Sequence, residues 1–379
     1  MKCIVNGKIV LPDRVEEGKA LLFDEKIAGV VCECQIPADA ERIDAEGCYV
    51  APGLVDIHIH GYLGEDTSDG KADGVRTMAC GVIKNGVTSF CPTTMTVSMD
   101  EINTALDAVR SVKDESEGWN GARILGVNLE GPFINPSKKG AQAEEHIKKP
   151  DAEFIKKNAD IIKLATIAPE MDDDFAEIKK IVAETDVRVS IGHTNATFEE
   201  AMGAVDAGAT HVTHLFNAQT ALHHRKPGVV GAAFTAPVSA ELIADTFHVH
   251  PGLFQMIHNI KKDKTVLITD CTRAGGMPDG DYTLGGQKII VKGIECLLED
   301  GTIAGSVLKL NNAVRNLLNN TDLSVSDAFN CASLNPAAAI GMEKEIGSLE
   351  DGKRADIVII DGDFNVKKTI IQGDIRYES

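Results

Sequence analysis

Six residues in this sequence, four histidines, one glutamate and one aspartate, stand at the ends of apolar stretches, where they could hold a metal ion. In the segment 50–61, His58 and His60 end an apolar run. Residues two positions apart in a strand point to the same side, so both imidazoles would face one surface. Taken alone, such a pair is equally compatible with two ordinary polar residues that leave a strand. The later stretches decide between these alternatives.

Four later apolar stretches end in the same way. Glu130 ends the stretch 124–130, and a Gly-Pro turn follows it. His193, His214 and Asp270 end the stretches 187–193, 211–214 and 265–270. Any one of them alone would more often be structural. Five such ends in order along the chain, beginning with a His-x-His pair, indicate a common site.

Imidazole and carboxylate together suit zinc or iron(II), which take nitrogen and oxygen ligands. A bound metal would lower the pKa of water from about 15.7 towards about 7 and so provide hydroxide at neutral pH. Asp270 is placed to take the proton from that water and to return it to a leaving nitrogen. The residues therefore predict metal-assisted hydrolysis.

The elements that must position these residues are strands alternating with amphipathic helical stretches, between residues 51 and 342. Helical spacing is seen, for example, at 101–112, 174–185 and 198–207. The alternation predicts βα units, a parallel sheet and, with eight units, an α/β fold of the TIM-type (β/α)8 barrel. In that fold the carboxyl ends of the strands build the active site. The eight predicted strands end near His60, Thr93 and Thr94, Glu130, Pro169 and Glu170, His193, His214, His248 and Asp270.

Both ends of the chain have a different pattern. Residues 1–50 alternate short β-like runs with turn residues, which favours a small antiparallel sheet, and residues 343–379 repeat this style. Neither piece can bury a core alone, so we expect both to form one small split β-sandwich domain beside the barrel of residues 51–342. The segment 275–301, rich in Gly and Asp, is predicted to be a β-hairpin excursion in the lid region. A structural loop without a substrate role is the alternative.

Composition limits the partners. The 379 residues are 43% hydrophobic and 25% charged, with a net charge of -19, which disfavours nucleic acid and anionic membrane surfaces. An anionic substrate would need a locally positive pocket. Residues 1–7 have no apolar core or cleavage site, so we expect a cytoplasmic protein. Nine scattered cysteines fit reduced thiols better than a disulfide framework.

Five motifs of the chain resemble those of the N-acetylglucosamine-6-phosphate deacetylases, a branch of the amidohydrolase superfamily. The resemblance covers essentially the whole chain. It implies hydrolysis of the N-acetyl group of N-acetylglucosamine 6-phosphate to glucosamine 6-phosphate and acetate. The motifs are His58-Ile59-His60, Asn128-Leu129-Glu130-Gly131-Pro132-Phe133, Gly192-His193-Thr194, Thr213-His214-Leu215-Phe216-Asn217-Ala218 and Thr269-Asp270.

The resemblance also implies residue roles. Glu130, His193 and His214 match the ligands of the metal found throughout the family, and His58 and His60 match a second metal position, with Glu130 as the bridge. Asp270 matches the catalytic base and acid. His248 matches the histidine that donates a hydrogen bond to the acetyl carbonyl.

Further positions match family residues that contact the sugar phosphate. Asn217 and Ala218 match a loop whose backbone amides bind the phosphate, and Arg225 matches a phosphate-binding arginine. Ala141 and Gln142 match a sugar-contacting pair, although many members have His where Gln142 stands. Family members generally form homodimers, so Arg225 would serve its own or the neighbouring site. A loop that closes over the sugar matches Ile303, Ala304 and Gly305.

Other functions stay open at this point. The same metal barrel hydrolyses cyclic amides, deaminates purines or cleaves N-acyl amino acids. Arg225, with Asn217 and Ala218, favours a phosphorylated amino sugar over these substrates. A non-catalytic assembly protein built on this barrel would be expected to have lost its metal ligands or its base, whereas this sequence keeps all of them.

Overall fold

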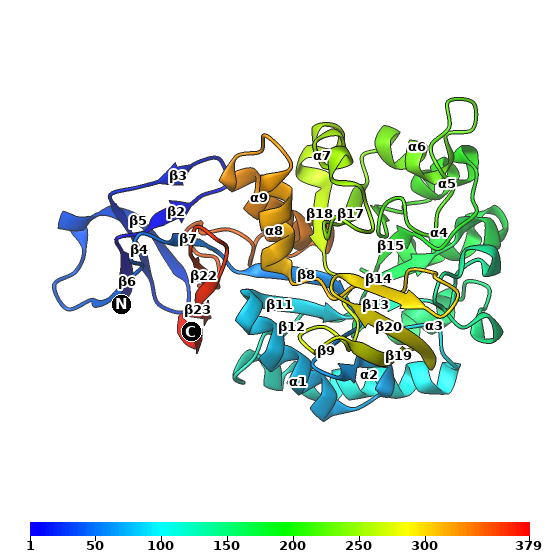
Figure 1. The fold of residues 1–379 in the computed structure, drawn as a ribbon, viewed down its shortest axis with the longest axis horizontal. Coiled ribbons are helices and arrows are strands. Elements are labelled where there is room, and N and C mark those ends of the chain that lie inside the picture. The colour runs from blue at the N-terminus through cyan, green and yellow to red at the C-terminus, as the bar shows by residue number, and fades with distance from the viewer.

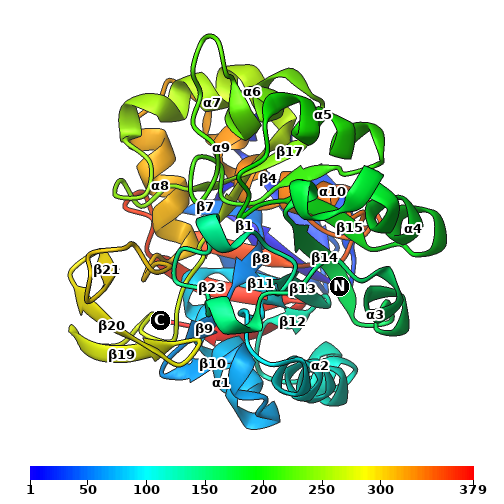
Figure 2. The same cartoon turned by 90° about the vertical axis from the view of Figure 1, so that its right-hand side faces the viewer.

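The computed structural model describes residues 1–379, and its larger part is a ring of parallel strands (Figures 1 and 2). Six strands form one parallel sheet, and two others form a second with the short β12 (Arg123–Ile124). Isolated parallel bridges join the two sheets at both edges, from Thr93 to Asn128 and from Ile59 to Cys271. This arrangement is consistent with a TIM-type barrel. The eight strands are β8 (Leu54–Ile59), β11 (Val87–Pro92), β13 (Val127–Glu130), β14 (Ile162–Ile167), β15 (Arg188–Ile191), β16 (His211–Val212), β17 (Ser239–Ile243) and β18 (Thr265–Ile268).

Helices follow the strands along the chain and surround them (Figure 2). The three stretches predicted to be helical correspond to α2, α4 and α5. Two of these helices begin at capping boxes, Ser98 with Glu101 and Thr197 with Glu200, in which side chain and backbone exchange hydrogen bonds. The helices are α1 (Ala72–Val82), α2 (Met99–Lys113), α3 (Ala152–Lys157), α4 (Ala176–Glu184), α5 (Phe198–Asp206), α6 (Gly228–Thr235), α7 (Phe254–Lys261), α8 (Leu310–Asn319), α9 (Val325–Ala332) and α10 (Leu334–Ala339).

The ring strands are apolar along most of their length because both of their faces are covered. Every residue of β8, β11, β13 and β17 is buried, and one cluster of 87 buried apolar residues extends through this part of the molecule. The polar exceptions include Asp56, His58 and Glu241. A polar group buried in such a core is costly without partners, so these exceptions mark the site described below.

Strands from the two ends of the chain share one six-stranded sheet, in the order β24-β23-β22-β7-β2-β3 (blue and red in Figure 1). A four-stranded sheet of order β5-β4-β1-β6 packs with residues of the six-stranded sheet in a separate cluster of 13 buried apolar residues. The division into domains at residues 50 and 343 stays a prediction. The strands are β1 (Lys2–Val5), β2 (Lys8–Val10), β3 (Val15–Glu16), β4 (Lys19–Phe23), β5 (Ile27–Cys32), β6 (Glu41–Asp44), β7 (Tyr49–Pro52), β22 (Ile357–Ile360), β23 (Val366–Ile371) and β24 (Asp374–Glu378).

The expectation of a purely antiparallel sheet at the amino end is wrong for two strand pairs. Strands β1 and β6 run parallel, and so do β2 and β7. Each pair is separated by several other strands, so the chain returns through a long connection. A tight hairpin forces two consecutive strands to be antiparallel, but a long connection allows a parallel pair. The composition of residues 1–50 does not show which distant strands pair, so the two parallel pairs could not be predicted.

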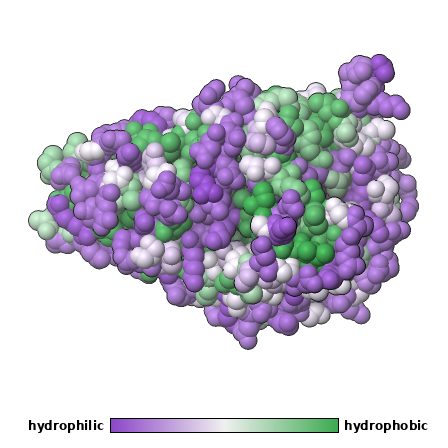
Figure 3. Space-filling model, viewed as in Figure 1, coloured by the Kyte–Doolittle hydropathy of each residue, from purple (hydrophilic) through white to green (hydrophobic).

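The excursion between β18 and α8 has three antiparallel strands instead of a single hairpin: β19 (Gly280–Leu284), β20 (Gln287–Lys292) and β21 (Glu295–Leu298). Its tip reaches the ring, where Gln287 donates a hydrogen bond to the carbonyl of Ala141. Two isoleucines of this excursion, Ile290 and Ile294, are exposed. The face of the molecule seen in Figure 3 is largely hydrophilic, and its larger apolar areas lie on the larger half. None of the helices has the length and apolar composition needed to cross a bilayer.

Candidate active site

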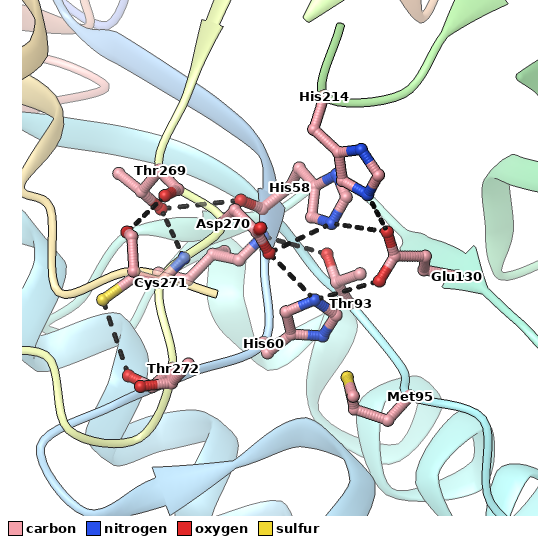
Figure 4. A network of polar contacts seen from close by, with 12 residues as sticks. His58, His60, Thr93, Met95, Glu130, His214, Thr269, Asp270, Cys271 and Thr272 are labelled. Atoms are coloured by element: carbon pink, nitrogen blue, oxygen red, sulfur yellow. Dashed lines mark hydrogen bonds and ion pairs between the residues drawn. The ribbon is translucent and has the colours of Figure 1, made fainter. Parts of the chain in front are cut away.

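The six predicted metal ligands and base lie together in two groups at the carboxyl ends of the ring strands. All of them except His193 are labelled in Figure 4. Within each group the candidate ligand atoms all lie within 4.8 Å of one another. We call them the His60 group (His58, His60 and Asp270) and the His214 group (Glu130, His193 and His214). The sequence prediction that these residues converge is confirmed.

Glu130 lies between the two groups. Its Oε1 is 3.0 Å from His214 Nε2 and 3.3 Å from His193 Nε2, and its Oε2 is 3.1 Å from His60 Nε2. On the other side of His60, Asp270 Oδ1 lies 3.1 Å from the same Nε2. Oε1 also lies 3.4 Å from His58 Nε2, so the Glu130 carboxylate contacts members of both groups.

The protonation pattern of the imidazoles fits a divalent cation. Three of them use Nδ1 to donate to oxygen: His58 to Glu241 Oε2 at 2.9 Å, His193 to the carbonyl of Lys138 at 2.8 Å, and His214 to the carbonyl of Asn217 at 3.1 Å. These oxygens only accept, so Nδ1 carries a hydrogen in each of the three rings and Nε2 is the nitrogen that faces the cluster. The Nε2 lone pair is available to a cation once no proton occupies it. His58 Nε2 is buried and has no hydrogen-bond partner. Nitrogen and carboxylate donors of this kind suit zinc or iron(II).

Charges within the cluster shift its protonation. Burial acts to lower the pKa of His60, but hydrogen bonds to Asp270 and Glu130 outweigh burial and raise that pKa to about 9. Burial likewise acts to raise the pKa of Glu130, yet the charges of His58 and His193 hold it well below its ordinary value. Without a cation, a proton on His60 partly balances the carboxylates.

Metal occupancy of the His60 group is therefore expected to rise with pH. Below about pH 9 a cation must displace the proton of His60, and Glu241 and Glu130 also raise the pKa of His58 in the same group against the effect of burial, so metal affinity should increase by at least tenfold per pH unit in this range. Equilibrium dialysis at fixed free zinc between pH 6 and 9.5, followed by metal counting per chain, measures this. The variant His60→Asn should show a weaker dependence, and an occupancy that is flat with pH in the native protein would contradict the expectation.

Backbone strain is concentrated at three residues of the cluster. His193, His214 and Asp270 have φ values of 45°, 26° and 50°, in the left-handed region that residues other than glycine rarely adopt. Each stands two residues beyond the last residue of its strand. Such strain persists only where the surroundings fix it, and it is typical of functional sites.

The cluster opens into a cavity of about 420 Å³. Several lining residues, among them Met95, Lys138 and Leu284, were not predicted from the sequence. Lys138 supplies a positive charge at the cavity wall, where its Nζ donates to the carbonyl of Gln219. The predicted substrate residues that do line the cavity are Ala141, Gln142, Asn217, Ala218, His248, Ile303 and Gly305.

His248 is oriented by Asp245. Its Nδ1 lies 2.6 Å from Asp245 Oδ2, and Asp245 Oδ1 accepts the backbone N–H groups of Phe247 and His248. The contact with Asp245 fixes the orientation of the ring and leaves Nε2 as its remaining nitrogen at the wall of the cavity. The predicted strand end near His248 is wrong, since β17 ends at Ile243. The turn that Asp245 forms with the next backbone amides ends the extended run.

Three predicted substrate residues lie differently from the expectation. Arg225 is exposed, contacts His224 Nε2 at 2.7 Å and lines a separate surface hollow, not the cavity of its own chain. Ala304 is fully buried behind the cavity. Gln142 lines the cavity with both ends of its amide already bonded, Nε2 to Glu130 Oε2 at 2.8 Å and Oε1 to the N–H of Thr96 at 2.6 Å.

Gly131, which follows Glu130, is expected to tolerate no side chain. It has a φ of 82°, and an added Cβ would lie 2.0 Å from Thr96 Oγ1. Gly131→Ala combines backbone strain with overpacking, so we expect a loss of about 2–4 kcal/mol in the free energy of unfolding. Gly286→Ala is the matched control, since Gly286 has a φ of 81° and open space around it. Denaturant titrations of both variants check this, and equal losses would exclude the steric contribution.

A parallel barrel whose strand ends gather imidazoles and carboxylates around a cavity defines the class of metal-dependent barrel hydrolases. The sequence profile of the amidohydrolase family matches residues 49–376. The chain belongs to this family, in the branch of the N-acetylglucosamine-6-phosphate deacetylases.

Individual relatives agree in sequence and in structure. An N-acetylglucosamine-6-phosphate deacetylase from Bacillus subtilis (strain 168) is 40% identical over 92% of this chain and 87% of its own. An N-acetylgalactosamine-6-phosphate deacetylase from Escherichia coli O157:H7 is 36% identical over 92% of each chain. The crystal structure of the Pasteurella multocida N-acetylglucosamine-6-phosphate deacetylase superposes with a TM-score of 0.95 over 100% of both chains, at 29% identity. A variant of the Mycobacterium smegmatis enzyme, solved in complex with N-acetyl-D-glucosamine-6-phosphate, has a TM-score of 0.91 over 99% of both, also at 29% identity.

Proposed function

We propose that this protein hydrolyses the N-acetyl group of N-acetylglucosamine 6-phosphate and releases glucosamine 6-phosphate and acetate. The observation that carries the proposal is the cavity that unites both groups of candidate ligands with His248 and Lys138. The names of the relatives supply the substrate. Two metal positions are proposed, with Glu130 between them and zinc or iron as the ion.

The residues of the chain divide the reaction among them. When bound, a divalent cation supplies a Lewis acid that lowers the pKa of water and polarises the acetyl carbonyl. The Asp270 carboxylate takes a proton from the attacking water, whose oxygen bonds to the carbonyl carbon. Nε2 of His248 donates to the oxygen on which negative charge develops. Asp270 then gives its proton to the sugar nitrogen as the C–N bond breaks, which leaves acetic acid and a free amine. The acid passes its remaining proton to the amine, so the products at neutral pH are acetate and the ammonium form of the sugar.

Acetate release tests this proposal directly. N-acetylglucosamine 6-phosphate, N-acetylgalactosamine 6-phosphate and unphosphorylated N-acetylglucosamine are compared, with protein of determined metal content. Turnover of the first substrate well above the other two is expected. Preference for the galactosamine compound would move the protein to the activity named for the Escherichia coli relative. No turnover of any of them by metal-loaded protein would refute the substrate assignment.

Arg225 is proposed to bind the phosphate in the neighbouring subunit of a homodimer, because it is exposed and lies outside the cavity of its own chain. Loss of a charge-assisted pair costs about 1.5–3 kcal/mol, so Arg225→Ala should raise KM for the phosphorylated sugar about 10- to 100-fold. Lys226→Ala, next in the sequence and also exposed, should have little effect.

Mixing subunits decides which cavity Arg225 serves. In a mixed dimer of Arg225→Ala and Asp270→Asn chains, one cavity would contain an intact Asp270 and an intact Arg225 from the partner. Recovered activity at low substrate concentration is therefore expected after mixing. If Arg225 acts in its own chain, every cavity keeps one defect and no activity returns.

A further inference from the structure

Glu241, on β17, is a buried carboxylate that belongs to neither group of candidate ligands and contacts both. Its Oε2 accepts the Nδ1–H of His58 at 2.9 Å and the backbone N–H of His214 at 2.9 Å. Its Oε1 accepts the Nε2–H of His211 at 3.1 Å. The side chains of Glu241, His58 and His211 are all 0% exposed.

A carboxylate at this depth carries a large desolvation cost, which an apolar residue at the same strand position would avoid. Hydrogen bonds from His58, His211 and the backbone of His214 offset that cost, and they do so only while all three donors are in place. His58 and Glu241 are 183 positions apart in the chain, and they meet only because the strands that carry them, β8 and β17, belong to the same barrel. Since the contacts of Glu241 lead to the cluster and not to the cavity, its effect must pass through the histidines.

We propose that Glu241 is a positioning residue that prepares both groups to bind metal. Behind His58 it fixes the hydrogen on Nδ1, so that Nε2 faces the cluster as an unprotonated ligand, and it makes that nitrogen a stronger donor. At His214 it holds the backbone N–H of a residue in a left-handed conformation. His211 secures the second oxygen of Glu241 and so keeps the carboxylate plane fixed.

The inference rests on the proposed metal positions but not on the proposed substrate, so metal affinity is its primary readout. Glu241→Gln keeps the shape of the side chain and one acceptor oxygen but removes the charge. Apo protein is titrated with zinc against a competing chelator, and we expect binding about 10- to 100-fold weaker than in the native protein. Native affinity in a folded Glu241→Gln variant would overturn the proposal.

Asp245→Asn provides the matched control. Asp245 is also a buried carboxylate with three hydrogen bonds beside the cavity, but it contacts His248 and neither group. Its amide variant should keep native zinc affinity. If both variants lose affinity equally, the effect reflects general loss of buried charge and the proposal is wrong.

A measurement on the native protein covers the case in which Glu241→Gln does not fold. In metal-loaded protein labelled with ¹⁵N at histidine, His58 should show a slowly exchanging proton on Nδ1 and none on Nε2. A His58→Gln variant identifies the signal by its absence. A His58 ring with its hydrogen on Nε2 would refute the role of Glu241. The zinc titration contains no substrate, so it tests the role of Glu241 alone. Acetate release tests the substrate separately, and a failure of one proposal can therefore be told apart from a failure of the other.

Discussion

Asp270→Asn is expected to lower kcat on the order of a thousandfold, within the range of 10²–10⁴ that general acid-base catalysis contributes. The amide has nearly the same shape as the carboxylate but can neither take the proton of water nor return it to the leaving nitrogen. Burial acts to raise the pKa of Asp270, but the hydrogen bond from His60 and the charge of His58 outweigh it and lower that pKa. The base is therefore already ionised at neutral pH in metal-free protein, and the positive charge of a bound cation would lower its pKa in the same direction. The acid limb of the native pH–rate profile should then lie below the ordinary range of an aspartate.

Steady-state kinetics on protein of equal metal content measures this effect. Asp172→Asn is a suitable control, since Asp172 is a buried aspartate that accepts backbone hydrogen bonds from Glu177 and Ile178 on α4. It should lower the free energy of unfolding and leave kcat nearly unchanged. A kcat for Asp270→Asn within tenfold of the native value would remove Asp270 from the proton transfers.

The sequence predicted the cluster because each of its residues stands at or just beyond the end of an apolar strand. A polar residue at such a point is visible as a break in the pattern, and the parallel order of the strands then places all breaks at one end of the barrel. His193, His214 and Asp270 even share the same offset from their strands. This regularity is local information that needs no knowledge of long-range contacts.

Other features depend on contacts that no local pattern encodes. Glu241 was missed, although a single charge within the apolar run 239–244 was the available signal. Its importance follows only from three donors on other segments of the barrel. Gln142 was expected at the sugar, yet its amide is bonded to Glu130 and to the backbone of Thr96. In both cases the sequence shows the residue type but does not show which distant groups it forms hydrogen bonds with.

Glu130→Gln should have the second large effect, because both groups depend on this carboxylate. The amide keeps one oxygen and replaces the other with an NH₂ group, which cannot coordinate a cation and would face either His60 or His214 and His193. We expect zinc to be absent from the purified variant and activity to fall at least a thousandfold. Gln142→Leu removes the donor to Glu130 Oε2 and the acceptor of the Thr96 N–H but no candidate ligand, so its effect on metal content should be much smaller.

Thermal unfolding separates loss of metal from loss of fold in this variant. A ligand that binds only the folded state adds stability as RT ln(1 + [L]/Kd), about 2.7 kcal/mol at a hundredfold excess over Kd. Added zinc should therefore raise the Tm of metal-free native protein by several degrees and leave that of Glu130→Gln unchanged. A zinc-dependent rise of equal size in both proteins would mean that the cation binds elsewhere, and the position of Glu130 between the groups would then have no role in holding it.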